Sequence, residues 1–385
     1  LDTFPETQEM IDWLMSRSSK NKEAVSNYGT YVNGVYKPRE FNVTVSNSGG
    51  EIGIYLVNQV DRDGFGYEIG AGYNQSWLNN ISEVADLLYR YDSYEGTDLY
   101  EHPKFKKMFN TIYQMTMAGG YTIHLGDYDR TASHKNTTSK LALLRGFKRL
   151  GEPLYARILY DVLGGTLTDT YIDIFEPDAE APKKEIEAIV AEQGPYKLGS
   201  RNLPGFGFAV LSGGELIKNS GAIANADFRR DTWLWYGNSV KSHGHEDLLQ
   251  MGINAYGFNF TPDLGYPKET GADPNRNQWV SATISHNTVV VDGKAQNTTE
   301  YALPYHYDGD GTVKLIDVDA AHVYEATDIY RRTLVSVDAS DEVSYTVDFF
   351  RVLGGNDHTY SFHTQSADGY TVDGLNLIPQ KDGTG

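Results

Sequence analysis

The sequence predicts an α+β protein in which a helical half is followed by a β half. From about residue 80 to about residue 165, apolar residues recur every three or four positions, the period of a helix buried on one side. From about residue 205 onward the period is two, and glycine, asparagine and aspartate separate short apolar runs. A chain of 385 residues is too long for one small core, so two domains are expected.

The helical half carries its apolar residues in successive stripes. These are Ile81, Val84, Leu87, Leu88 and Tyr91, then Phe105, Met108, Phe109, Ile112 and Met115, and then Leu141, Leu144, Phe147 and Leu150. The Gly-Glu-Pro run at 151–153 interrupts the pattern, because glycine and proline end helices, and a further stripe begins at Leu154. We expect successive antiparallel helices.

The β half is predicted from short alternating runs. They lie at 208–211, 252–256, 288–291, 313–316 and 343–347. The Asp-Gly-Asp-Gly run at 308–311 predicts a hairpin turn, and the acidic stretch at 176–192 predicts a linker or a solvated last helix. We therefore expect a helical domain at 1–200 and an antiparallel β domain at 201–385, with a cleft between them.

Composition excludes several classes of protein. The net charge of -19 disfavours nucleic acid as a partner, since phosphate binding needs clustered Lys and Arg. The sequence has no apolar run of the roughly 18 residues that cross a bilayer, so we expect no membrane segment. The absence of cysteine excludes disulfides and thiolate chemistry. The 28 tyrosines, against 15 phenylalanines, offer faces on which sugar rings stack and hydroxyls that transfer protons.

The two ends of the chain lead to expectations about where the protein is located and whether it continues. The first residues do not form a signal peptide, as in a cytoplasmic protein or one that has been processed or trimmed. We expect a secreted or periplasmic bacterial protein whose signal peptide is not in this chain. The sequence stops just past a strand-like run, so we also expect the natural protein to continue beyond residue 385.

A cluster of histidines in the β half is the main candidate site. His243 and His245 are two residues apart, so in an extended segment both imidazoles point to one face. The two histidines can bind one ion together, or each can have a separate role. Asp263 and His286 are candidate further ligands. Two histidines and one carboxylate suit Zn²⁺. The alternative is a set of hydrogen-bonded structural histidines.

Four blocks in the β half resemble, in order, the β-sandwich region of the heparinase II/III-like polysaccharide lyases. They are 243–247, 263–266, 285–296 and 348–352, and the run His-Asn-Thr-Val-Val-Val-Asp-Gly at 286–293 is the most specific. Upstream, 63–68 with 73–75 resembles the segment that places polar active-site residues on a toroid helix. The run Leu-Gly-Asp-Tyr-Asp-Arg at 125–130 is similar to the loop with that family's catalytic tyrosine.

The resemblance implies a fold and an activity. The fold is an incomplete (α/α) toroid followed by an antiparallel β-sandwich, and the activity is elimination on an anionic uronic-acid polysaccharide, either alginate or a glycosaminoglycan. His245, Asp263 and His286 would hold a mainly structural Zn²⁺, and His243 would face the substrate. The chain departs from the family at Gln75, where several relatives have a histidine, and this shifts the expected base toward tyrosine.

The resemblance also implies catalytic roles. Tyr128 is the expected base, and its phenol can then protonate the leaving oxygen, while Arg130 supplies the cation that lowers the tyrosine pKa. Tyr121 is the second choice for that role. Arg130 can alternatively be an exposed ion-pair partner of a neighbouring aspartate, and Tyr128 can simply cap a loop between helices.

The substrate carboxylate gains charge during elimination, so donors beside it are expected to contribute most. Asn74 and Gln75 can donate amide hydrogen bonds, Arg130 a guanidinium fork, and His243 can donate or assist proton removal. Tyr266 can close the far side of the cleft. For Asn74 the alternative is an N-cap of the following helix.

Two other functions remain open from the sequence. A glycoside hydrolase on a related toroid would use paired carboxylates among Asp61, Asp63 and Glu68. A non-catalytic carbohydrate-binding protein would use tryptophan platforms, for which the candidates are Trp77, Trp233, Trp235 and Trp279. The sequence does not indicate the oligomeric state.

Overall fold

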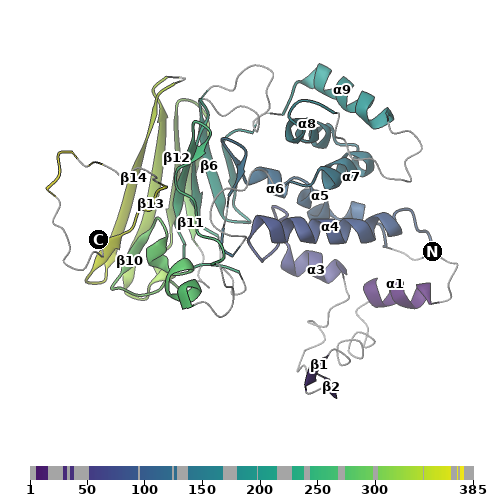
Figure 1. The fold of residues 1–385 in the computed structure, drawn as a ribbon, viewed down its shortest axis with the longest axis horizontal. Helices are drawn as coiled ribbons and strands as arrows, with labels where there is room; N and C mark the ends of the chain where they lie inside the picture. The colour runs from purple at the N-terminus through teal and green to yellow at the C-terminus, as the bar shows by residue number, and fades with distance from the viewer. Residues whose placement is uncertain are drawn as a thin grey trace.

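The structure is a computed structural model. It describes residues 6–15, 29–32, 35–38, 52–93, 96–123, 125–127, 138–167, 180–196, 198–214, 228–237, 243–267, 274–297, 302–340, 342–365, 371 and 373–376. Helices gather on one side of the molecule and two larger antiparallel sheets on the other (Figure 1). Among the described helices, none has both the length and the apolar character that a bilayer crossing requires.

The described α-helices and the short helix η2 precede the large sheets in the chain. They are α1 (Thr7–Met15), α3 (Ile52–Gln59), α4 (Ala71–Leu88), η2 (Leu99–Glu101), α5 (Pro103–Met108), α6 (Thr111–Gln114), α7 (Lys140–Leu150), α8 (Pro153–Val162) and α9 (Ala181–Gln193). Two hairpins accompany them, β1 (Gly29–Val32) with β2 (Val35–Pro38) and β3 (Thr116–Met117) with β4 (Tyr121–Thr122). The acidic stretch before the sheets therefore contains a helix, α9.

Local sequence signals set the ends of α7 and α8. The Ser139 hydroxyl accepts a hydrogen bond from the Ala142 amide at 3.1 Å and so caps the start of α7. Gly151 ends α7 with a φ of 66°, which costs glycine little, and Pro153 occupies the first turn of α8. The predicted break at 151–153 is confirmed.

The predicted start of the helical pattern and one member of its first stripe are wrong. Helix α4 begins at Ala71 rather than near residue 80, and its buried face includes Leu78, Ile81 and Leu88. Leu87 is 66% exposed, because it lies on the other side of this helix. An apolar residue beside a stripe does not have to belong to it.

The β half contains a five-stranded sheet, a four-stranded sheet and a two-stranded pair, all antiparallel. The five-stranded sheet runs β5 (Arg201–Leu203), β6 (Phe208–Gly213), β7 (Arg230–Trp235), β8 (Met251–Ala255) and β9 (Phe258–Asn259). The four-stranded sheet runs β11 (Leu303–Asp308), β12 (Val313–Asp319), β13 (Thr327–Asp338) and β14 (Ser344–Gly354), and β10 (Val289–Val291) pairs with β15 (His358–Tyr360). All five predicted strands and the hairpin turn at 308–311 are confirmed.

The two larger sheets pack face to face around one core. Leu211 of β6 and Leu234 of β7 share a buried cluster with Ile316 of β12 and Leu334 of β13. A cluster on the other face of the five-stranded sheet joins Trp233 and other residues of β6 and β7 to apolar residues of the helical half. The five-stranded sheet is therefore the middle layer of the molecule (Figure 1).

Buried polar contacts fasten the helical half to this middle sheet. Arg201 on β5 donates from Nε to the Gln114 carbonyl at 2.6 Å and from Nη2 to the Thr116 carbonyl at 2.8 Å. Asp231 on β7 accepts a hydrogen bond from the Ala118 amide at 2.6 Å. A cavity of about 240 Å³ opens at this junction, between residues 58–69 and the ends of β5 and β7.

Candidate active site

The site lies where two loops of different halves are held together. The Asp127 amide donates to the His243 carbonyl at 2.7 Å. A Cβ added to Gly126 would lie 2.0 Å from that carbonyl oxygen, and Gly126 has a φ of 67°. Only glycine satisfies both conditions without strain, so Gly126 sets the approach of the two loops.

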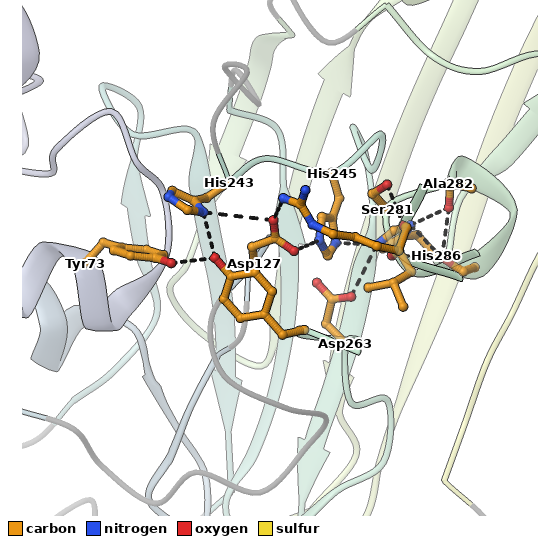
Figure 2. A network of polar contacts seen from close by, with 12 residues as sticks. Tyr73, Asp127, His243, His245, Asp263, Ser281, Ala282 and His286 are labelled. Carbon is orange, nitrogen blue, oxygen red and sulfur yellow. Dashed lines mark hydrogen bonds and ion pairs between the residues drawn. The ribbon is translucent and has the colours of Figure 1, made fainter. Parts of the chain in front are cut away.

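A buried His/Asp cluster occupies one end of the site. His245 Nδ1 lies 3.2 Å from His286 Nε2, and His286 Nε2 lies 3.3 Å from an oxygen of Asp263. Together with Asp247, each residue offers one ligand atom within 4.8 Å of the others, and all four residues are buried. The three residues expected to hold a metal are thus brought together (Figure 2), and Asp247 is a fourth candidate ligand.

The donor set fits a divalent ion. In the part of the chain that the structure describes, neither oxygen of the buried Asp263 carboxylate receives a well-directed hydrogen bond. Burial disfavours a charged imidazole, but the Asp263 carboxylate outweighs this and raises the pKa of His286 to about 9. The proton thus supplies positive charge that a bound cation can replace.

Asp127 connects the buried cluster to the remainder of the site. One of its oxygens lies 3.3 Å from His245 Nε2, and the other accepts a hydrogen bond from Arg276 Nη2. Burial tends to raise the pKa of Asp127, but its contacts to His245 and Arg276 outweigh this and lower it. Asp127 is therefore an ionised carboxylate between a candidate metal ligand and an arginine.

At the other end, a histidine and two tyrosines form one group. The Tyr266 hydroxyl lies 2.9 Å from His243 Nδ1 and 2.6 Å from the Tyr73 hydroxyl. The Tyr73 ring stacks on the His243 imidazole with a centroid distance of 4.1 Å. We call Tyr73, His243 and Tyr266 the His–Tyr group; Figure 2 shows Tyr73 and His243 at the opposite end of the network from His286.

The His–Tyr group is partly open to solvent and has a defined protonation state at Tyr266. The His243 side chain is 21% exposed, whereas the His245 side chain has no exposed surface. Burial and the hydrogen bond with Tyr73 raise the pKa of Tyr266. Tyr266 is therefore a neutral phenol at neutral pH, suited to donate a proton or a hydrogen bond.

Glu68 closes one side of this group. One of its oxygens lies 3.9 Å from His243 Nε2, and the other accepts a hydrogen bond from Trp77 Nε1 at 2.8 Å. Asp61 and Asp63 are used differently. Asp61 accepts from backbone amides of its own loop, and Asp63 accepts from the Gly205 amide at 2.6 Å. Two of the three carboxylates considered for a hydrolase thus bind backbone.

Asn74 and Gln75 also make structural contacts. Asn74 is buried within α4, where it accepts from the Gly66 amide at 2.6 Å and donates to the carbonyls of Ile69 and Gly70 at 3.2 Å and 3.1 Å. The N-cap alternative is wrong, because Gly70 occupies that position. Gln75 accepts from the Ser139 amide at 2.7 Å and so links α4 to the start of α7.

The remaining predicted residues lie elsewhere. Tyr128 and Arg130 fall outside the described residues. Tyr121 lies on β4, where its ring packs against Gly119, and Gly257 adjoins the same glycine. Of the tryptophans considered as sugar platforms, Trp233 and Trp235 are buried core residues, which corrects that assignment, whereas Trp279 is 45% exposed.

Sequence reasoning missed Arg276 altogether. It begins the short helix η3 (Arg276–Val280) and lies 149 positions after Asp127 in the sequence. An arginine in an Asn-Arg-Asn run carries no signal of such a contact. The sequence offered Tyr73 only as a member of a motif, Asp127 only as a motif member or an ion-pair partner of Arg130, and Glu68 as a candidate carboxylate of a hydrolase.

Comparisons with known proteins show what the second half of this chain is similar to in sequence, and what most of the chain is similar to in fold. Residues 198–377 match the family model described as Heparinase II/III-like, C-terminal. The resemblance predicted from the sequence is confirmed over these residues. No curated protein sequence matches the chain.

Particular solved structures share the fold. A heparinase III gene product is 17% identical with a TM-score of 0.56, and the match covers 83% of this chain and 43% of that one. The heparan sulfate lyase HepC from Pedobacter heparinus is 16% identical with a TM-score of 0.53, over 83% of this chain and 44% of that one. At these identities the similarity concerns the fold alone, and this chain spans less than half the length of each protein.

Proposed function

We propose that the protein is a polysaccharide lyase that cleaves a uronic-acid-containing chain, an alginate or a glycosaminoglycan, by β-elimination. The observation that supports this most is the His–Tyr group, which is partly open to solvent at the junction of the two halves and is joined through Asp127 to the His/Asp cluster. The match of residues 198–377 to the Heparinase II/III-like, C-terminal family model also supports this proposal.

The chemistry assigns roles within the His–Tyr group. Elimination removes the C5 proton of the uronate and breaks the bond to the oxygen at C4, so a base and a proton donor are needed. Tyr266 is a neutral phenol, so its role is donation to the leaving oxygen or to His243. His243 contacts the substrate, as base or as donor to the carboxylate, and Tyr128 with Arg130 remains the base proposed from the resemblance.

Other proposed residues act through position. Asn74 shapes the loop that presents Glu68, because its amide binds the backbone on both sides of that residue. Gln75 links α4 to α7. We keep Tyr121 as an alternative base only if Tyr128 proves dispensable.

We propose Zn²⁺ as the ion of the His/Asp cluster, bound by His245, Asp263 and His286 with Asp247 nearby. When bound, the ion supplies a fixed positive charge that cross-links the loops carrying these ligands. The residues around it do the rest: His245 holds Asp127, and Asp127 lies 3.9 Å from His243 Nδ1. The ion would therefore stabilise the position of His243 indirectly, through His245 and Asp127.

The finer architecture and location are proposals of the same kind. We propose that the helices of the first 200 residues form part of an (α/α) toroid, and that residues 201–385 form the β-sandwich domain. We also propose that the protein is secreted or periplasmic, where anionic polysaccharides are met.

An absorbance assay tests the activity. The protein is mixed with alginate, heparan sulfate, chondroitin sulfate or hyaluronan, and the near-ultraviolet absorbance of an unsaturated uronate is followed. A rise with at least one polymer supports the lyase. New reducing ends without absorbance would identify a hydrolase, and binding without either product would identify a carbohydrate-binding protein.

A further inference from the structure

We propose that Arg276 is the residue that binds the acidic group of the sugar, a carboxylate or a sulfate, beside the His–Tyr group. This inference rests on the proposed function only in placing a sugar at that group. It assigns to a described residue a task for which the sequence offered Arg130.

The position of Arg276 is the first argument. Its Nη2 donates to Asp127, and its guanidinium carbon lies 5.9 Å from the centre of the Tyr266 ring. The Tyr266 hydroxyl in turn contacts His243 and Tyr73. A sugar that touches the His–Tyr group therefore lies within reach of the guanidinium.

The unused hydrogen-bonding capacity of Arg276 is the second argument. A guanidinium carries five N–H donors in a planar fork that matches the oxygens of a carboxylate or a sulfate. Among the described residues, Nη2 makes the contact to Asp127, while Nε is buried and has no hydrogen-bond partner. The side chain is 28% exposed, so a ligand can approach it.

The charge around the site is the third argument. The chain has a net charge of -19, and Glu68, Asp127, Asp247 and Asp263 all lie in or beside the site. An anionic sugar is repelled by such a surface unless a cation stands next to it. Asp127 fixes the guanidinium in place and keeps it charged, because their hydrogen bond raises the pKa of Arg276.

Substitution of Arg276, with a matched control, tests the inference. Arg331 is the control, because it also pairs with an aspartate, Asp317, and covers a tyrosine ring, that of Tyr305, at 4.5 Å, but it lies on β13. Binding of alginate, hyaluronan, chondroitin sulfate and heparan sulfate oligosaccharides is measured by calorimetry for the wild-type protein, R276A, R276K, R331A and R331K. Thermal unfolding shows which variants are folded.

The expected result is a Kd at least about 10-fold higher in R276A, a smaller rise in R276K, and no change in the Arg331 variants. Equal losses on the unsulfated and sulfated oligosaccharides identify the carboxylate, and losses confined to the sulfated ones identify the sulfate. If R276A does not fold, the comparison of R276K with R331K decides. Unchanged Kd values in the folded Arg276 variants, or no binding by the wild-type protein, overturn the inference.

The same proteins separate this inference from the proposed lyase activity. Weakened binding in R276A without any unsaturated product from the wild-type protein would uphold Arg276 and reject the lyase. Product from the wild-type protein with unchanged Kd and KM in R276A would uphold the lyase and reject the assignment of Arg276.

Discussion

At the scale of single residues, the site depends on a few hydroxyls and carboxylates whose protonation the protein controls. The Tyr266 hydroxyl contacts both His243 and Tyr73, and its pKa is raised, so it keeps its proton. Asp127, one oxygen of which lies 3.9 Å from His243 Nδ1, has a lowered pKa and stays ionised. A neutral donor and a fixed negative charge thus flank one imidazole.

We expect Tyr266→Phe to reduce kcat by about 100-fold, because it removes a proton donor to His243 or to the leaving oxygen. Its effect on thermal stability should stay near 1 kcal/mol, the value of a lost hydrogen bond. Tyr73→Phe is the comparison, since it keeps the ring on His243 and loses one hydroxyl contact. Initial rates of absorbance change measure both. A fully active Tyr266→Phe variant would remove Tyr266 from the mechanism.

Asp61 should make stability depend on pH. Burial raises its pKa to about 6 although backbone amides oppose this. The folded state therefore favours the protonated form: this contribution is fully present below pH ~4 and is lost as pH rises through about 6. Asp61→Asn keeps the acceptor oxygen and abolishes the charge. Its stability relative to wild type should rise by about 1–2 kcal/mol between pH 4 and pH 7 in denaturant titrations, and a constant difference would contradict the assignment.

At the scale of elements, contacts to backbone groups set the geometry of the loops at the site. The loop at 125–127 and the segment from His243 meet through Gly126 and the Asp127 amide. The Asn74 side chain similarly fixes the loop before α4 through backbone groups of three residues. The side chains of the candidate site are held by these contacts.

Gly126→Ala should be much more harmful than Gly151→Ala. Both glycines have nearly the same φ, 67° and 66°, but a Cβ on Gly151 meets nothing within 4 Å. We expect about 1 kcal/mol of destabilisation for Gly151→Ala and at least twice that for Gly126→Ala, which must also separate the two loops. Thermal unfolding and turnover are measured together. Equal losses in the two variants would show that the loop contact contributes little.

At the scale of the whole molecule, the middle sheet binds both the helical half and the outer sheet, so the site depends on the packing of all three layers. Arg201 and Asp231 of the middle sheet bind backbone groups of the segment at 114–118. The buried His/Asp cluster brings together the segments that carry His245, Asp263 and His286. Such a molecule should unfold cooperatively.

Metal removal should therefore lower the thermal stability of the whole protein. We expect about one equivalent of zinc per chain in the purified protein, and chelation should lower the Tm by several degrees, because a bound ion stabilises only the folded state. His286→Ala should lose the metal and the response to chelator, whereas His358→Ala, on exposed β15, should keep both. Elemental analysis and thermal unfolding measure these effects. A protein without metal, and with a Tm indifferent to chelator, would contradict the assignment.

Much of the fold could be predicted because local signals decide it. The break at 151–153 and the strands at 208–211 and 313–316 follow from glycine, proline and alternation, and each is present. Leu87 was misplaced and the start of α4 was missed, because neighbouring segments, and not periodicity, decide which face of a helix is covered. The three residues His245, Asp263 and His286 could be predicted because each lies in a short sequence block that resembles the family, and the structure brings them together.

The sequence by itself determined the two kinds of secondary structure, their order, and the histidines and aspartate that converge in the His/Asp cluster. Only the tertiary structure decided that Arg276 meets Asp127, that Tyr73 stacks on His243, and that Asn74 serves the backbone. The physical reason is range. Periodicity and turn chemistry act over a few neighbouring residues. Several contacts of this site instead join residues more than one hundred positions apart, and they form only when the three layers pack.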